Sequence, residues 1–289
     1  MAVINTNVAA TLTANALTKN DRDMTQTMER LSTGKRINSA ADDAAGLAIS
    51  SKMTSQIRGL NQAVRNGNDA ISMLQTADGA MIEVSNMLQR MRELSVQAGN
   101  GTLSSADLTA LNTEFVALRT EIERIADNTQ WNGDNLLDGS AGANGLMTFQ
   151  VGYEANQTIT VNLGDLQLDG DAAYSAGATA GGVFTNDIDS LTITTMALAN
   201  TTVAALDVSI AGLDAKRATI GAAINTLEYA VDNLANVSQN TAASRSRIED
   251  ADYASETTEL ARTQIIAQAG TAMLSQANQQ AQSVLALLK

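Results

Sequence analysis

The stretch LARTQIIAQAGTAMLSQANQQAQSVLALLK (residues 260–289) decides the fold through the spacing of its apolar residues. Apolar and small residues recur in it at alternating steps of three and four, which places them along one face of a coiled-coil helix. They are Leu260, Ala267, Gly270, Leu274, Ala277, Ala281, Val284 and Leu288, with Thr263 at the one polar step. Because a single helix cannot bury such a face, we expect this segment to pack against another helix.

The other end of the chain supplies a partner. Residues 1–35 carry a second apolar series, which Thr33-Gly34 interrupts. We expect the two ends to lie side by side as antiparallel helices, with an apolar terminal seam that drives assembly between copies. The predicted terminal seam contains Val3, Ile4, Val8, Leu12, Met24, Met28, Leu31, Leu274, Ala277, Ala281, Val284, Leu285 and Leu288.

Two more helices are predicted in the first half of the chain. Residues 41–98 form one long helix, whose apolar seam changes phase near Asp78. The second helix starts at a capping Ser104 or Ser105, has the most regular period in the chain and closes around Asn128.

Strict alternation of apolar and polar residues then predicts a β-hairpin over residues 147–163. Residues 164–200 show no sustained period and are expected to form a surface insert, with one strand at Leu191 to Thr195. A long seamed helix follows over residues 203–234, in which the charged Arg217 is expected to set the register. The polar stretch 240–246 predicts a hinge before the terminal helix.

These segments predict a mainly α fold: a long antiparallel helical rod or coiled coil with a small β-hairpin and a short irregular insert. We expect paired terminal helices over residues 1–43 and 247–289. The helical rod with its hairpin covers 44–163 and 201–246. A small, surface-exposed variable insert covers 164–200.

Composition supports long helices and argues against catalysis. The chain has 289 residues with 44% hydrophobic and 3% aromatic residues, and it has no proline, whose presence inside a helix costs ~3 kcal/mol. It also has no cysteine and no histidine, which excludes disulfides and removes the commonest general base and metal ligand. We therefore expect no enzymatic activity and no cofactor.

The charge distribution narrows the class of partner. The net charge is −13, and residues 126–214 contain eleven acidic and no basic residues. An acidic middle argues against binding to nucleic acid or to an anionic membrane surface. The first twenty residues do not resemble a signal peptide, and no run reaches the ~20 apolar residues expected of a membrane-spanning helix. We expect no membrane insertion.

Several motifs resemble those of bacterial flagellins. In chain order they are VINTN (3–7), ERLSTGKRINSAADDAAGLAIS (29–50), LQRMREL (88–94), RSRIEDADY (245–253) and AQAGTAMLSQAN (267–278). The resemblance covers residues 1–163 and 200–289. The chain departs from many flagellins in lacking a proline after Asn278 and in lacking large outer domains.

The resemblance implies a structural subunit that polymerises into the extracellular flagellar filament and drives swimming. It further implies type III export with a chaperone bound to the C-terminal helix, and contact with the filament cap and hook-junction proteins. A hook–filament junction protein of the same helical family is the alternative. A flagellin carrying a metalloprotease is excluded, because its His-Glu-x-x-His site needs histidine.

The resemblance also implies a surface recognised by a vertebrate Toll-like receptor and shared with polymerisation. Its predicted members are Leu88, Gln89, Arg90, Glu93, Leu94, Gln97 and Glu114. The alternative is that Arg90 and Glu114 are ordinary solvated charges and that Leu94 contacts a neighbouring rod. Family members also suggest possible O-linked glycosylation, for which the candidates are Ser175, Thr179, Thr185 and Ser190.

Asp42-Asp43 is the one acidic pair that suggests a metal site. Neither histidine nor spaced carboxylates accompany it. We therefore expect these residues to act at a helix start or an interface, and we expect no metal.

Overall fold

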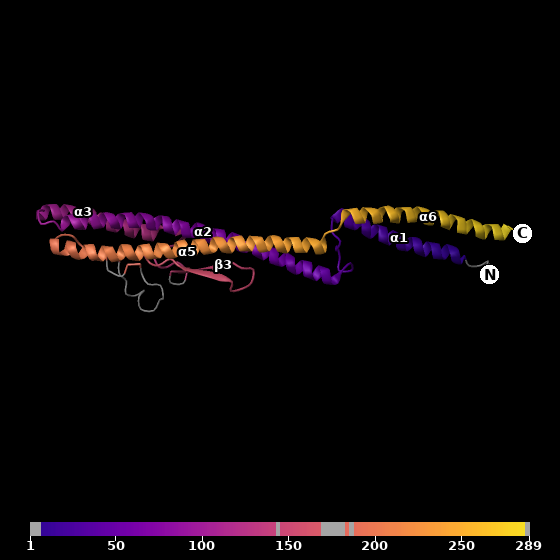
Figure 1. Ribbon diagram of the computed structural model, residues 1–289, viewed down its shortest axis with the longest axis horizontal. Coiled ribbons are helices and arrows are strands. Elements are labelled where there is room, and N and C mark those ends of the chain that lie inside the picture. Colours follow the sequence, from indigo (N-terminus) through magenta and orange to yellow (C-terminus); the bar gives the residue numbers. More distant parts are fainter. Residues whose placement is uncertain (1–6, 143–144, 169–182, 185–187, 287–289) are drawn as a thin grey trace. The chain divides into compact units, whose positions relative to one another are not determined.

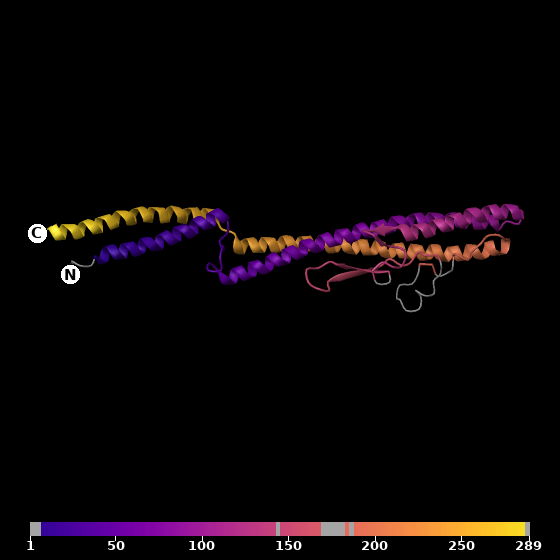
Figure 2. The same ribbon diagram turned by 180° about the vertical axis from the view of Figure 1, so that it is seen from behind.

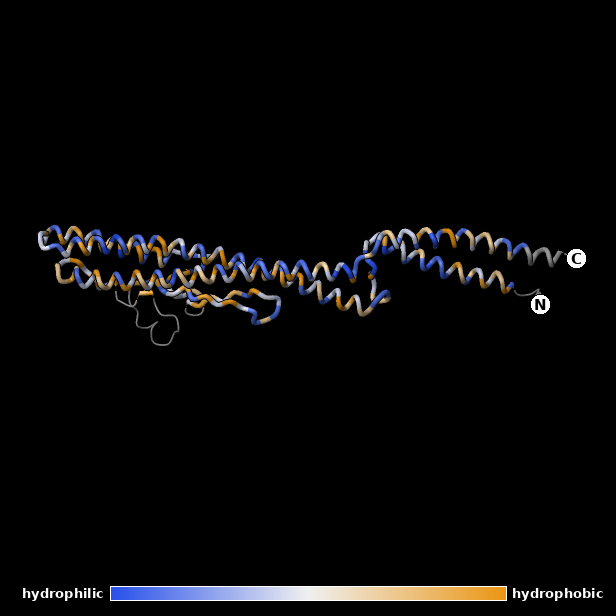
Figure 3. The backbone as a smooth tube through the Cα atoms, viewed as in Figure 1, coloured by the Kyte–Doolittle hydropathy of each residue, from blue (hydrophilic) through white to orange (hydrophobic). Residues whose placement is uncertain are grey.

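A computed structural model describes residues 7–142, 145–168, 183–184 and 188–286, with side chains up to residue 279. It divides into two compact units. Unit 1 contains Met1–Ile57 and Gln239–Lys289, and unit 2 contains Arg58–Ser238. The predicted mainly α, antiparallel helical class is confirmed, and hydrophobic and hydrophilic residues alternate along the helices (Figure 3).

Unit 1 contains the paired terminal helices α1 (Val8–Thr33) and α6 (Tyr253–Ala286), which lie side by side in both views (Figures 1 and 2). Asn7 caps α1 by accepting a hydrogen bond from the Ala10 amide at 3.1 Å. Gly34 ends α1 at φ 71°, a left-handed conformation that glycine adopts without a Cβ penalty, and its amide donates to the Arg30 carbonyl. The predicted pairing and the break after Thr33 are both confirmed.

Two long helices, α2 (Ala44–Ala98) and α5 (Met196–Glu249), contribute residues to both units. Asp43 starts α2 by accepting from the Gly46 amide at 2.8 Å, as expected of a helix-start acid. The predicted hinge at 240–246 is wrong, because α5 remains helical through Glu249. That stretch is polar but has no glycine or proline to end a helix.

The predicted boundary of the terminal part is also displaced. The first turns of α2 are tied to the last turns of α5 inside unit 1, since Ser50 donates to Glu249 at 2.5 Å and Arg245 donates to Thr54 at 3.2 Å. The N-terminal segment of unit 1 therefore extends past residue 43, and its C-terminal segment begins before residue 247.

Unit 2 is a helical bundle of α2, α5 and the shorter α3 (Ser105–Asn128) (Figure 1). Ser104 caps α3 in a capping box with Asp107, which confirms the predicted start. The buried core includes Phe115 and Ile122 of α3, together with Leu206, Leu213, Ile220 and Leu227 of α5.

The seam of α2 does not change phase near Asp78. Its buried positions continue at steps of three and four because small residues occupy the steps between the large ones. They are Leu60, Ala63, Gly67, Ala70, Leu74, Ala77, Met81, Val84, Leu88, Met91, Ser95 and Ala98. A Cβ on Gly67 would lie 2.5 Å from a methyl group of Val231, so this glycine allows α2 and α5 to approach closely. Arg217, which was expected to set the register, pairs with Asp78, with Nε 2.9 Å from a carboxylate oxygen.

Two small antiparallel hairpins lie in unit 2. Strands β1 (Gln130–Trp131) and β2 (Asp134–Asn135) are joined by Asn132-Gly133, both at positive φ, as a two-residue hairpin loop requires. Strands β3 (Leu146–Gln150) and β4 (Thr158–Asn162) form the predicted hairpin, with Met147 opposite Val161 and Phe149 opposite Ile159.

The described part of residues 164–200 is not a wholly exposed insert, which corrects the prediction. Leu166, Leu168, Val183, Phe184, Ile188 and Ile193 are buried in the bundle core. The Val183 amide donates to the Asp165 carbonyl at 2.9 Å, and the Ile193 amide donates to the Asn112 side chain at 3.0 Å. Residues 191–195 form no strand, because their backbone groups bond to side chains of the bundle. The Asn112 side chain accepts from the Ile193 amide, and the Thr202 hydroxyl donates to the Thr192 carbonyl.

Helix α5 is long and apolar enough to cross a membrane by length and composition alone, contrary to the sequence expectation. Leu206, Leu213, Ile220 and Leu227 of this helix have no exposed surface in the bundle, whereas Met196, Leu198 and Val208 are exposed. Packing within unit 2 explains why the buried residues are apolar.

Candidate assembly and recognition surfaces

The contact between α1 and α6 includes buried polar and small side chains. Asn20 is buried and donates from its side chain to the Thr263 carbonyl at 2.8 Å. Asn7 donates in the same way to the Ala277 carbonyl at 3.1 Å. A Cβ on Gly270 would lie 3.3 Å from Leu17, so the helices approach closely at this step. Hydrogen bonds and close backbone approach therefore contribute to this pairing beside the half-buried apolar side chains of both helices.

Several large apolar side chains of both helices point outward. Val8 is 63% exposed and Leu12 is 72% exposed on α1, while Ile265 is 66% exposed and Met273 is 60% exposed on α6. Full burial of such a side chain contributes about 1.5–3 kcal/mol, a gain that this unit leaves unused within one chain. Ile265 and Ile266 were not among the predicted seam residues. The signal was available, because adjacent isoleucines cannot both point into a seam one helix face wide.

The predicted terminal seam therefore divides into two faces. Met24, Leu31, Leu274 and Ala277 are half-buried where α1 meets α6. Val8, Leu12 and Met28 are exposed, which corrects their placement in the contact between the two helices of one chain. The remaining members lie outside the described residues or have undescribed side chains: Val3, Ile4, Ala281, Val284, Leu285 and Leu288.

A charged cluster fixes the segment between α1 and α2. Glu249 lies 2.5 Å from the Lys35 ammonium and accepts the Ser50 hydroxyl, and these contacts lower the pKa of its carboxyl. The Arg36 amide donates to the Glu249 carbonyl at 2.7 Å, and the Ala251 amide donates to the Gly34 carbonyl at 3.0 Å. These bonds hold the segment that follows α1 (residues 34–36) against the segment that precedes α6 (residues 249–251).

Asp42 anchors the same segment. Its carboxylate accepts the Ser39 amide at 2.8 Å, the Asn38 amide at 3.1 Å and the Gln26 side chain at 2.7 Å. These hydrogen bonds, led by the Ser39 amide, lower the pKa of Asp42 to about 2. Through these bonds and the bond from the Gly46 amide to Asp43, the acidic pair 42–43 acts at a turn and a helix start.

The predicted receptor surface contains one organised charge cluster. The Arg90 guanidinium reaches from α2 to Glu114 of α3 at 2.9 Å and to Glu93 at 3.0 Å. Hydrogen bonds from Arg90 to these carboxylates, first to Glu114, raise the pKa of the guanidinium. Arg90, Glu93 and Glu114 are all exposed, so the cluster presents both signs of charge across two helices.

Two predicted members do not belong to that surface. Leu88 has no exposed area and Leu94 is 1% exposed, because both point into the bundle core. The predicted contact of Leu94 with a neighbouring rod is wrong for the same reason. Gln89 and Gln97 are exposed beside the charge cluster. Val96, with 55% of its surface exposed, is the large apolar residue that this part of α2 turns outward.

Of the four candidate glycosylation residues, Ser190 is exposed in the described structure. Ser175, Thr179 and Thr185 lie outside the described residues.

Two family models match most of the chain. Residues 4–142 match the bacterial flagellin N-terminal helical region, and residues 203–288 match the bacterial flagellin C-terminal helical region. The flagellin of Bacillus subtilis (strain 168) is 42% identical over 302 aligned residues, covering 99% of this chain and 99% of the relative. The flagellin of Halalkalibacterium halodurans is 44% identical over 262 residues, covering 91% of this chain and 90% of the relative.

Two solved structures are also similar. The crystal structure of Bacillus cereus flagellin has a TM-score of 0.48 and 32% identity, covering 59% of this chain and 88% of that one. A Vibrio parahaemolyticus protein described as flagellar hook-associated has a TM-score of 0.57 at 16% identity, covering 72% of this chain and 100% of that one, which shows a shared fold. On the family models and the full-length relatives, this chain belongs to the bacterial flagellins, the structural subunits of the extracellular flagellar filament.

Proposed function

We propose that copies of this chain polymerise into the swimming filament through the outward faces of α1 and α6. The observation that carries the proposal is that unit 1 buries polar side chains and exposes large apolar ones. Its internal contact uses Asn20 and Thr263, while Leu12 and Ile265 are among its most exposed apolar side chains. Identical copies that bury these side chains against one another would recover the unused hydrophobic free energy, and repetition of such a contact builds a helical polymer.

The experiment places polar residues on the outward face. Leu12→Gln and Ile265→Gln, singly and together, are compared with Asn15→Gln, a substitution at an exposed polar position of α1. We expect the first two to raise the monomer concentration needed for seeded polymerisation, measured by sedimentation and negative-stain microscopy. Asn15→Gln should polymerise like the unaltered chain. Equal polymerisation by all four proteins would contradict the proposal.

The relatives bear on the two alternatives to this function. Those compared by sequence are flagellins, which agrees with a non-enzymatic structural protein. The likeness to the hook-associated protein is one of fold, at 16% identity, and nothing in it favours a junction role. The filament subunit is therefore the function we carry forward.

The same outward face requires cover before assembly. Ile265, Ile266 and Met273 of α6 are all exposed in the single chain. An export chaperone that binds α6 would shield them and prevent premature polymerisation. The filament cap and the hook-junction proteins would contact the same terminal helices at the two ends of the filament. Copurification of an α6 variant carrying Met273→Gln with the chaperone should decrease, whereas Asn278→Gln on the same helix should leave it unchanged.

We propose further that a vertebrate Toll-like receptor recognises the charge cluster of unit 2. Arg90 and Glu114 are exposed and oriented by each other, and Gln89 and Gln97 extend the polar surface. Arg90→Ala should reduce stimulation of receptor-bearing cells while leaving the unfolding midpoint nearly unchanged, because surface ion pairs contribute ~0.2–1 kcal/mol. Arg124→Ala removes a comparable exposed pair on α3 and serves as the control. Equal stimulation by both variants would rule out Arg90 as a contact residue.

A further inference from the structure

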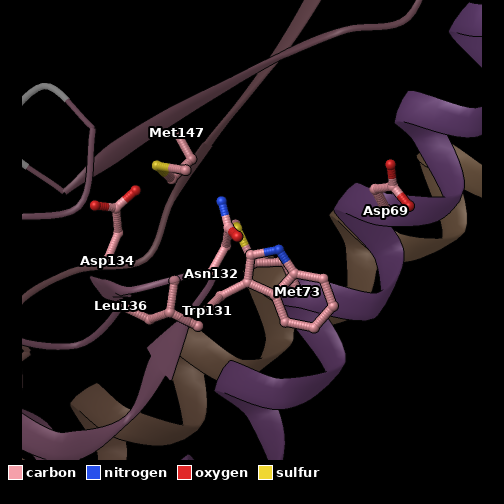
Figure 4. A pocket seen from close by; sticks show the side chains of 7 residues that line it. All are labelled: Asp69, Met73, Trp131, Asn132, Asp134, Leu136 and Met147. Atoms are coloured by element: carbon pink, nitrogen blue, oxygen red, sulfur yellow. The ribbon is translucent and has the colours of Figure 1, made fainter.

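An open groove in unit 2 takes no part in the surfaces described so far. Its volume is about 550 Å³, and it lies between α2 and the two hairpins. A neighbouring hollow of about 300 Å³ shares Asp69, Met73, Trp131 and Met147 with it. The groove is lined by Asp69, Met73, Trp131, Asn132, Asp134, Leu136 and Met147 (Figure 4).

The chemistry of the groove is that of a site for an organic cation. Trp131 is 36% exposed, and in the close-up its indole ring lies between the carboxylates of Asp69 and Asp134 (Figure 4). Indole is the aromatic ring that attracts cations most strongly, and thioethers such as Met73 and Met147 adapt to irregular alkyl chains. Two carboxylates beside such a ring favour an ammonium or a guanidinium carried on an aliphatic stem.

Nothing in the described part of the chain neutralises these two carboxylates. The carboxylates of Asp69 and Asp134 have no hydrogen bond or ion pair with another described residue. No lysine or arginine occurs between Arg124 and Lys216, so the hairpin side of the groove carries no cation of its own. Arg65, one turn before Asp69 on α2, instead donates its Nε to the Gln62 side chain at 3.2 Å.

We propose that this groove receives a lysine or arginine side chain from a second copy of the chain. The inference rests on the proposed polymerisation, which brings many copies into one repeated arrangement. Charge complementarity identifies the occupant: the groove presents unpaired acid, and the same chain presents exposed cations without a described partner, Lys52 and Arg58 on α2. A guanidinium or ammonium that stacks on Trp131 between the carboxylates would fix the register between neighbouring copies.

Trp131 reports on its own groove because it is the one tryptophan of the sequence. The first experiment compares acrylamide quenching of tryptophan fluorescence in monomers and in seeded filaments of the full chain. We expect filament formation to reduce quenching several-fold, because the docked side chain covers the indole. Equal quenching in monomers and filaments would show an empty groove and would overturn the proposal.

The second experiment removes the charges. The double variant Asp69→Asn, Asp134→Asn is compared with Glu83→Gln, Asp232→Asn, which removes two charges at exposed positions of unit 2 away from the groove. At low salt, the groove variant should need a roughly 10-fold higher monomer concentration to polymerise than the control. The difference should shrink at 1 M salt, where the screening length falls to about 3 Å. Circular dichroism checks that both variants are folded.

The outcomes separate the two levels of inference. Protection of Trp131 with equal polymerisation by both double variants would mean that the occupant is not held by charge, and the proposal would be wrong. Failure of the unaltered chain to polymerise at all would overturn the proposed function and this inference together. Polymerisation with an unprotected Trp131 would overturn this inference alone.

Discussion

Units 1 and 2 are built from similar helices but distribute their apolar side chains in opposite ways. In unit 2, Leu74, Met81, Phe115 and Leu213 have no exposed surface. In unit 1, the buried contact includes Asn20 and Thr263, and large apolar side chains remain outside. Unit 2 completes its core within a single chain, while unit 1 leaves large apolar side chains exposed, which neighbouring copies would cover under the proposed function. On that proposal, assembly of the filament depends on the outward faces of α1 and α6, and stability of the chain depends mainly on the core of unit 2.

The largest expected effect is on removal of either terminal helix. Deletion of residues 1–35 or 255–289 should abolish filament formation, because each helix of the α1–α6 pair loses its partner, and isolated helices are marginal in water. Unit 2 should remain folded, with its unfolding transition retained in circular dichroism. Sedimentation after seeding measures assembly. Filaments formed by either truncated chain would contradict the proposal that assembly requires the α1–α6 pair.

The next effect concerns the segment first expected to be a surface-exposed insert. Replacement of residues 168–192 by a Gly/Ser linker would remove Leu168, Val183, Phe184 and Ile188 from the core of unit 2. Each contributes ~1.5–3 kcal/mol through burial, so we expect a large fall in the urea midpoint of unfolding.

The matched control for that replacement is a linker in place of residues 169–182. The shorter change keeps all four buried side chains, and the hydrogen bond from Val183 to Asp165 shows that the ends to be joined are close. We expect its urea midpoint to remain near that of the unaltered chain. Similar midpoints for the two replacements would mean that the buried side chains of this segment add little to the core.

A smaller effect on stability is expected from a comparison of a core position and a surface position of α2. Leu94→Ala should destabilise unit 2 by about 2–5 kcal/mol, since it opens a cavity in a packed core. Val96→Ala, at a position 55% exposed on the same helix, should change stability by no more than ~0.5 kcal/mol. Urea unfolding of the two variants tests the difference. A mild effect of Leu94→Ala on stability, together with a strong effect on receptor signalling, would restore Leu94 to the recognition surface.

The smallest effect is a pH dependence localised to unit 1. The pKa of Asp42 is lowered from 3.8 to about 2 in the folded chain, so the unfolded chain binds more protons between these values. The stabilisation is fully present above the unfolded pKa and is lost as the pH falls through about 2. Asp42→Asn should weaken the acid dependence of thermal unfolding between pH 4 and pH 2, followed by circular dichroism. Asp21→Asn on α1 is the control, and identical pH profiles for both variants would count against this role.

The sequence by itself determined the helices, their order and the position of the hairpin. Regular steps of three and four from Leu108 to Ile125 and strict alternation from Met147 to Tyr153 are local signals, so both elements appeared where predicted. Gly34 and Ser104 likewise marked helix ends through their own backbone and side-chain chemistry. The motifs that resemble flagellins were sufficient to identify the family.

The tertiary structure alone decided which side of each helix became core. Val8 and Leu12 belong to an apolar series, yet both are exposed, while the polar Asn20 is buried where α1 meets α6 and bonds to the Thr263 carbonyl. Leu94 was predicted to lie on the recognition surface, but it is buried in the core of unit 2. The buried Ala63, Ala70 and Ala77 fill steps of the α2 seam between the large residues, so the seam is continuous. A count of large apolar residues alone did not reveal this continuity. A period fixes where a stripe runs along a helix, whereas the packing of neighbouring helices fixes which stripe is buried.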